Sequence, residues 1–250
     1  MQCVIESGGL RLSGYLARPE GAVASAPGLV LCHGFPAGPG GAATSGQTYP
    51  ELAERLAADT GWIVLAFNFR GTGSSEGNFS LAGWLDDLRA AIDYLLAVDG
   101  VSDVWLLGSS TGGALAICEA GEDERVRGVA TLSARADFAD WAADPQRFLE
   151  HARAIGVITD RSFPADPDAW GRELSEIRPT ALIGKIPPRP ILLVHGGEDN
   201  TVPLQDARVL ADAATDAVEL RVLAEAGHRL RHDPRAVALV IGWMERQAGR

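Results

Sequence analysis

The chain has 250 residues, of which 46% are hydrophobic, a size and composition that suit one domain of the larger α/β kind. Its formal net charge of −11 repels phosphate, and no run reaches the roughly 18 apolar residues of a membrane span, so neither nucleic acid nor a membrane is an expected partner. The first residues lack a secretory signal, and the three cysteines show no CxxC spacing. We therefore predict a cytoplasmic protein, monomeric or homodimeric, without a metal centre.

The N-terminal segment predicts two strands, at residues 4–5 and 10–17, around a Gly8-Gly9 turn. Downstream, continuous apolar runs typical of strands covered on both faces alternate with amphipathic helical patterns. The predicted strands are 28–32, 62–67, 101–107, 126–132, 190–195 and 218–224. The predicted helices are 50–58, 81–98, 110–120, 204–214 and 234–247. This alternation predicts an α/β fold, with a mostly parallel twisted sheet and helices on both of its faces.

Residues 134–188 interrupt this alternation. The segment is too long for a simple crossover and shows no clear buried strand, although residues 145–150 and 168–177 have helical patterns. A loop of this length in a compact domain is usually functional. We predict that residues 134–188 form an inserted helical cap, and that residues 1–133 and 189–250 form the core domain.

A candidate nucleophile lies in the sequence Gly108-Ser109-Ser110-Thr111-Gly112, which matches G-x-S-x-G. The motif follows a predicted buried strand and opens a helix of small residues, the setting in which a tight turn lifts a serine hydroxyl clear of the sheet. Such a turn requires small residues two positions before and two after the serine. Ser109 is the nearest rival, but its register does not fit the glycines. The motif therefore indicates Ser110 as the nucleophile.

A serine nucleophile needs a base, and the base needs an orienting acid. Asp199 follows the predicted strand 190–195, and His228 follows the predicted strand 218–224, so both lie at the sheet edge that carries Ser110. The order Ser110, Asp199, His228 is the one expected for this architecture. Glu198 and Asp137 are alternative acids; we expect Glu198 to be solvated, and Asp137 lies at the start of the predicted cap.

The other histidines have structural interpretations. We expect His33 to brace the loop after its strand, His195 to be packed, and His151 to be solvated in the cap. His228 and His232 are four residues apart, which resembles a zinc pair on a helix. The helix is predicted to begin only at residue 234 and no third ligand is evident, so we expect no metal.

Acyl transfer also requires donors for the developing oxyanion. The backbone N–H of Thr111 is one candidate, and the backbone N–H of Phe35, in the loop after strand 28–32, is the other, because Pro36 has no N–H. Phe35 is also the first candidate for a substrate pocket. Trp141 and Trp170 in the cap either fix the cap to the body or line an acyl pocket.

The sequence resembles the α/β-hydrolase superfamily over nearly its whole length. The motifs that carry the resemblance are His33-Gly-Phe-Pro36, Phe69-Arg-Gly-Thr-Gly-Ser-Ser75, Gly108-x-Ser110-x-Gly112, Val194-His-Gly-x-x-Asp199-x-x-Val-Pro203 and Gly227-His228. Within the superfamily the chain is similar to small bacterial carboxylesterases of the cinnamoyl- and feruloyl-esterase kind, and to serine-aminopeptidase-like and monoglyceride-lipase-like hydrolases.

The resemblance implies the α/β-hydrolase fold and the same roles for Ser110, Asp199, His228 and the backbones of Phe35 and Thr111. Serine at position 110 argues against dehalogenases, which use aspartate there, and dienelactone hydrolases, which use cysteine. We predict a cofactor-free serine hydrolase that cleaves small-molecule carboxylic esters of small to medium apolar or aromatic acyl groups. The alternatives are a peptidase or amidase with the same triad, and a non-catalytic ligand-binding protein.

Overall fold

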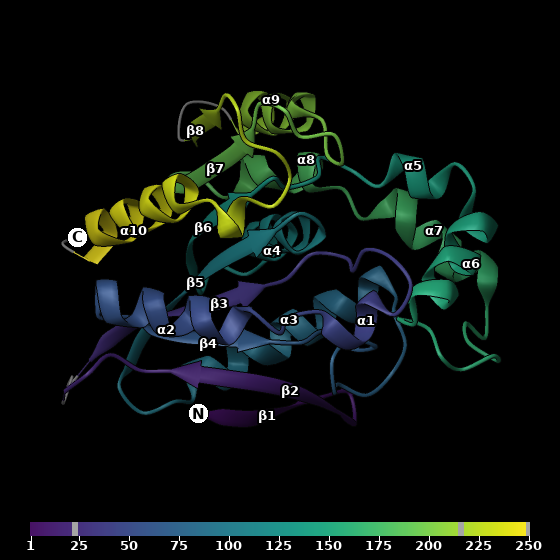
Figure 1. Ribbon diagram of the computed structural model, residues 1–250, viewed down its shortest axis with the longest axis horizontal. Coiled ribbons are helices and arrows are strands. Elements are labelled where there is room, and N and C mark those ends of the chain that lie inside the picture. The colour runs from purple at the N-terminus through teal and green to yellow at the C-terminus, as the bar shows by residue number, and fades with distance from the viewer. Residues whose placement is uncertain (22–24, 215–217, 249–250) are drawn as a thin grey trace.

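The computed structural model describes residues 1–21, 25–214 and 218–248. Within them, an eight-stranded sheet has the strand order β1-β2-β4-β3-β5-β6-β7-β8 (Figure 1). β1 (Gln2–Ser7) and β2 (Leu10–Ala17) run antiparallel to their neighbours, and the remaining strands pair in parallel. The predicted α/β-hydrolase fold with a mostly parallel sheet is confirmed.

The parallel strands lie close to their predicted positions, and all but the last, which is half-buried to exposed at the sheet edge, are largely buried, continuous apolar runs. They are β3 (Ala26–Cys32), β4 (Ile63–Phe67), β5 (Val101–Ser109), β6 (Val126–Leu132), β7 (Ile191–Gly196) and β8 (Val218–Leu223). β1 extends further than the predicted 4–5, because Gln2 and Glu6 pair with β2 while their side chains face solvent.

Helices cover both faces of the sheet, as predicted (Figure 1). The core on one face includes side chains of α2 (Tyr49–Thr60) and α10 (Pro234–Ala248). The core on the other face includes side chains of α3 (Leu81–Leu96), α4 (Thr111–Glu122) and α9 (Leu204–Ala214). None of the helices in the described residues is both long and apolar enough to cross a bilayer.

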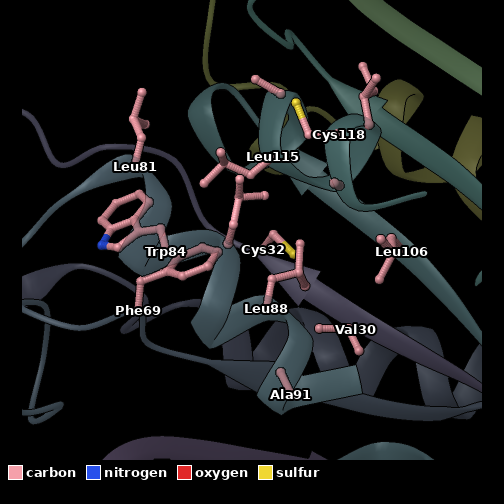
Figure 2. Close-up of a cluster of buried hydrophobic side chains, with 14 of the residues drawn as sticks. Val30, Cys32, Phe69, Leu81, Trp84, Leu88, Ala91, Leu106, Leu115 and Cys118 are labelled. Atoms are coloured by element: carbon pink, nitrogen blue, oxygen red, sulfur yellow. The ribbon is translucent and has the colours of Figure 1, made fainter. Parts of the chain in front are cut away.

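Figure 2 shows part of the second of these cores, in which side chains of α3 and α4 pack against those of β3 and β5. Phe69 and Trp84 stack there with their ring centroids 4.4 Å apart. Cys32 at the end of β3 and Cys118 in α4 are both buried in it. Ser80 caps α3 by accepting a hydrogen bond from the N–H of Gly83, which fixes where this helix begins. The packing of α3 and α4 against the sheet therefore sets the position of the turn before α4.

Residues 134–188 form short helices, namely α5 (Ala139–Ala142), α6 (Pro145–Ile155), α7 (Pro167–Glu176) and α8 (Pro179–Leu182). The helical patterns at 145–150 and 168–177 correspond to α6 and α7, each begun by an aspartate N-cap, Asp144 or Asp166, and a following proline. Figure 1 shows α5, α6 and α7 together at one end of the sheet. α8 instead packs on α4 and α9, so this part of the predicted cap lies on the body.

Candidate active site

Ser110 occupies a strained turn between β5 and α4. Its backbone has φ 53° and ψ −120°, a region that residues with a side chain rarely adopt. A Cβ atom on Gly108 would lie 2.4 Å from the carbonyl oxygen of Gly112, and one on Gly112 would lie 2.3 Å from that of His33. Both contacts are too close for any residue but glycine. The G-x-S-x-G spacing is therefore what this turn requires sterically.

Asp199 and His228 lie together at the same sheet edge, in the loops that follow β7 and β8. The Nδ1 atom of His228 donates a hydrogen bond to Oδ2 of Asp199 at 2.8 Å. The backbone N–H groups of Thr201 and Val202 donate to Oδ1 of Asp199, each at 2.9 Å. A Cβ on Gly196 would lie 2.3 Å from the carbonyl oxygen of Ala226, so glycine lets the two loops approach each other.

The charge state of Asp199 follows from these contacts. Burial raises the pKa of this carboxyl, but the hydrogen bonds from His228 and from the backbone of Val202 and Thr201 outweigh burial and lower the pKa to about 2. Asp199 is therefore ionised at neutral pH. An ionised acceptor at Nδ1 of His228 keeps the proton on that atom and leaves Nε2 free to accept one.

Ser110 and His228 line one cavity of about 280 Å³, together with residues from the loop after β3 and the start of α2. Within the described part of the chain, no hydrogen bond joins the Ser110 hydroxyl to the His228 ring. Such bonds are often long in unliganded sites and tighten when substrate binds. The cavity thus brings the predicted nucleophile and base to a shared space with the Asp199–His228 pair already formed.

The loop after β3 approaches Ser110 closely. A Cβ on Gly34 would lie 3.0 Å from Cβ of Ser110, and Phe35 follows directly. Thr111 is the first residue of α4, so its N–H has no acceptor within the helix. Among the hydrogen bonds between described residues, none uses the N–H of Phe35 or Thr111. Both predicted oxyanion donors are therefore unoccupied and adjacent to Ser110.

His33 holds this loop in place, as expected. It is 1% exposed, its Nε2 accepts a hydrogen bond from the N–H of Phe69 at 3.1 Å, and its Nδ1 lies 2.8 Å from the carbonyl oxygen of Gly34. Burial lowers the pKa of His33 to about 4, so the ring is neutral. Arg70, which follows Phe69 in the chain, forms an ion pair at 2.7 Å with the buried Asp87. The oxyanion loop is thus tied to the loop after β4.

The remaining candidates from the sequence lie elsewhere. His195 is buried and donates from Nε2 to the carbonyl oxygen of Val202 at 2.9 Å, which supports the loop of Asp199. Glu198 and Asp137, the alternative acids, are exposed. His151 and His232 are exposed too. Across residues 1–21, 25–214 and 218–248, no group of three or more His, Cys, Asp or Glu side chains is arranged to hold a metal ion.

The three aromatic candidates, Phe35, Trp141 and Trp170, differ in whether they line the cavity. Phe35 lines the cavity, and its ring centroid lies 5.0 Å from that of Trp141. Trp170 is 3% exposed, donates from its indole N–H to the carbonyl oxygen of Phe79 at 3.1 Å, and does not line the cavity. Trp141 is half-buried and also does not line it. Phe35 therefore contacts the site, Trp141 supports Phe35, and the position of Trp170 favours the interpretation that it packs the cap on the body.

The sequence reasoning missed part of the cavity wall. Tyr49 at the start of α2 lines the cavity, and so do Arg229 and Arg231 beyond His228. The hydroxyl of Tyr49 is buried and has no hydrogen-bond partner among the described residues. The two arginines were detectable because they follow the predicted base within three positions. Tyr49 carried no such signal, since its approach to Ser110 depends on how α2 packs.

Comparisons with known proteins define the class. A model of the alpha/beta hydrolase family matches residues 29–240. Est1E from Butyrivibrio proteoclasticus superposes with a TM-score of 0.73 at 20% identity, covering 98% of this chain and 96% of that one. The chain belongs to the alpha/beta hydrolase family.

Two curated relatives are similar in sequence. The 2-hydroxymuconate semialdehyde hydrolase of Pseudomonas sp. (strain CF600) is 28% identical over 253 residues, covering 85% of this chain and 84% of that protein. The uncharacterized protein YfhR of Escherichia coli (strain K12) is 27% identical over 167 residues, covering 66% of this chain and 52% of that protein. The chain thus spans about half the length of YfhR.

Proposed function

We propose that the protein is a serine hydrolase that cleaves carboxylic esters through an acyl-enzyme intermediate. The observation that supports this most is the Asp199–His228 hydrogen bond beside a cavity that Ser110 lines from a strained turn. The family assignment agrees with a hydrolytic reaction. A small-molecule ester suits a cavity of about 280 Å³.

In the proposed mechanism, Nε2 of His228 takes the proton of the Ser110 hydroxyl, and Asp199 stabilises the resulting imidazolium. The serine oxygen attacks the ester carbonyl, and the backbone N–H groups of Phe35 and Thr111 bind the oxyanion. When the carbon–oxygen bond to the alcohol breaks, His228 gives its proton to the leaving oxygen. Water then attacks the acyl-enzyme by the same route, which releases the acid and regenerates Ser110.

The acyl group is proposed to be small to medium in size and apolar or aromatic. The ring of Phe35 packs on Trp141 and Phe148, at centroid distances of 5.0 and 5.4 Å, and these cap residues favour apolar contact next to the proposed oxyanion donors. A second candidate substrate is a semialdehyde of the kind named for the Pseudomonas relative, which the sequence similarity over 85% of the chain favours.

The proposal is tested by active-site labelling and turnover. A fluorophosphonate probe should label the wild-type protein and the Ser109→Ala variant, with the adduct located on Ser110 by mass spectrometry. The Ser110→Ala variant should not be labelled, and its kcat with p-nitrophenyl acyl esters should fall by about 10⁶-fold while the fold is retained. Labelling of the Ser110→Ala variant, or wild-type turnover by it, would contradict the assignment.

The same measurements rank the reactions. A panel of p-nitrophenyl acyl esters, aminoacyl amides and 2-hydroxymuconate semialdehyde should show the highest kcat/KM for an ester. Faster turnover of the amides or of the semialdehyde would reverse that ranking, while labelling at Ser110 would still support the nucleophile. Failure of the native protein to label would support a non-catalytic role.

A further inference from the structure

The charged side chains that line the cavity of the candidate site are both positive. Arg229 and Arg231 line the cavity that contains Ser110 and His228, and no aspartate or glutamate is among its lining residues in the described part of the chain. The chain as a whole has 33 acidic and 22 basic side chains of the Asp, Glu, Lys and Arg types. Acidic side chains outnumber basic ones in the chain, but the cavity is lined by two arginines and by no acidic side chain of the described residues. The positive charge of the cavity is therefore opposite in sign to the net charge of the protein.

Neither arginine is neutralised by a neighbouring carboxylate. No Asp or Glu oxygen of the described residues lies within 4.0 Å of the guanidinium of Arg229 or Arg231, whereas Arg70, Arg125 and Arg235 each have an aspartate at 2.7 to 2.8 Å. Arg229 is exposed and Arg231 is half-buried. Both guanidinium groups therefore keep donors that an anion in the cavity could occupy.

Arg231 is also held in position. Its guanidinium carbon lies 5.4 Å from the centroid of the Tyr49 ring, in a cation–π contact, and its Nε donates a long hydrogen bond of 3.5 Å to the Thr48 hydroxyl. Tyr49 is itself 6% exposed and packed at the start of α2. An arginine that is stacked on an aromatic ring loses less side-chain freedom when it binds a ligand, and the guanidinium fork matches carboxylate and phosphate oxygens.

The position of the arginines relates to the proposed chemistry. In that mechanism His228 protonates the leaving oxygen, so the leaving group lies beside His228. Arg229 is the next residue in the chain and Arg231 follows after one more, while the aromatic contacts of Phe35 are with cap residues. The two sets of side chains come from different elements and offer different chemistry to the two halves of an ester.

We propose that Arg229 and Arg231 form an anion subsite that binds a carboxylate or phosphate on the leaving-group half of the substrate. This inference rests on the proposed hydrolase function and names the substrate class for the same site. It predicts esters whose acyl group is apolar or aromatic and whose alcohol carries the negative charge.

The test uses matched acetate esters. The anionic ester is 4-acetoxybenzoate, its neutral counterpart is 4-acetoxybenzamide, and 4-acetoxyphenyl phosphate presents a phosphate instead. A fourth ester, monophenyl succinate, carries its carboxylate on the acyl side. The quantity compared is the ratio of kcat/KM for each charged ester to that for the neutral amide, which cancels any general loss of activity or of folded protein.

The wild-type ratio for 4-acetoxybenzoate or for the phosphate should be about tenfold or more, and whichever ester gives the higher ratio identifies the anion. Arg229→Gln and Arg231→Gln should each lower that ratio at least about fivefold, and Arg231→Lys should lower it less, because it keeps the charge. Arg208→Gln, which removes the same charge from an exposed position on α9, should keep the wild-type ratio. The ratio should also decrease in high salt.

A wild-type ratio near one, a preference only for monophenyl succinate, or a ratio that both glutamine variants leave unchanged would overturn the anion subsite while leaving ester hydrolysis in place. If no ester in the set is hydrolysed, the proposed function itself is wrong and the inference is wrong with it.

Discussion

The turn at Ser110 and the aromatic part of the cap are held by different kinds of contact. At the turn, backbone segments pack directly against each other. A Cβ on Gly108 would lie only 2.4 Å from the Gly112 carbonyl oxygen, so there is no space for a side chain between them. In the cap, side chains meet side chains, as where the rings of Trp141 and Phe148 stack 4.1 Å apart. Close packing of one backbone segment on another is possible only with glycine, whereas many combinations of apolar side chains can fill a packed aromatic cluster.

That difference separates the parts of the site that are rigid from those that can vary. The atoms proposed to perform the reaction lie beside glycines, Gly108, Gly112 and Gly196, at which any side chain would clash with the backbone. The atoms proposed to select the acyl group lie where substitutions change the volume and shape of a packed cluster. Changes at the first region should therefore affect turnover or folding as a whole, and changes at the second should alter preference among substrates.

After the loss expected for Ser110→Ala, the largest effect is expected at Asp199. Asp199→Asn removes the charge that stabilises the His228 imidazolium and the acceptor that fixes its tautomer, so kcat for p-nitrophenyl acetate should fall by about 10⁴-fold. Glu198→Gln, next to it but exposed, should retain wild-type kcat. An equal loss in the two variants, or a small loss in Asp199→Asn, would contradict the role of Asp199 as the orienting acid.

A large effect on stability is expected at Gly112. The new methyl group of Gly112→Ala would lie 2.3 Å from the His33 carbonyl oxygen, so the free energy of unfolding should fall by about 3 kcal/mol or more, measured by chemical denaturation. In Gly242→Ala, within α10, the new Cβ would lie 3.8 Å from Nη1 of the Arg246 side chain, an ordinary contact, and helix propensity should raise stability by about 0.5–1 kcal/mol. A fully stable Gly112→Ala variant would show that the turn tolerates a side chain there.

An intermediate effect depends on pH. Glu119 of α4 is 2% exposed and lies 3.1 Å from Arg89. Burial raises the pKa of this carboxyl from 4.5 to about 7, although Arg89 opposes the shift. The stability contributed by protonated Glu119 is full below pH 4.5 and is lost as the pH rises through about 7.

Glu119→Gln cannot ionise, so its unfolding free energy relative to wild type should rise between pH 4.5 and 8 by about 2–3 kcal/mol. Denaturation of both proteins across that range measures the difference. Parallel pH profiles for the two proteins would show that Glu119 titrates in its usual range.

The smallest effect is expected in the cap. Trp141→Ala removes the ring that supports Phe35, so kcat/KM for a bulky aromatic acyl ester should fall about tenfold relative to the acetate. Trp170→Ala removes a buried packing residue and should lower stability without changing that ratio. If Trp170→Ala lowered that ratio and Trp141→Ala did not, Trp170 rather than Trp141 would be the residue next to the acyl group, and the interpretation of Trp170 as a pocket residue would be supported.

The sequence predicted the sheet well because most of the parallel strands are buried, continuous apolar runs, and it predicted where Ser110, Asp199 and His228 lie because each follows the carboxyl end of a predicted strand. Phe35 was identified for the same reason. The short helices α5 and α8 were not predicted, since four residues give too little periodicity to be recognised. The contacts of Tyr49 and Trp170 could not be predicted, because they depend on how one helix packs on other elements. The periodicity of apolar residues within a helix does not contain that information.

The buried cysteines have a consequence for measuring motion. Cys32 is the last residue of β3, directly before the loop proposed to bind the oxyanion, and burial raises the pKa of its thiol. Burial likewise raises the pKa of Cys118, in α4, to about 12. Neither thiol can react until its surroundings open, so the rate at which a thiol reagent modifies each one reports the local opening of β3 or of α4. The protein therefore contains two internal probes of opening, one on each side of Ser110, that work without any substrate.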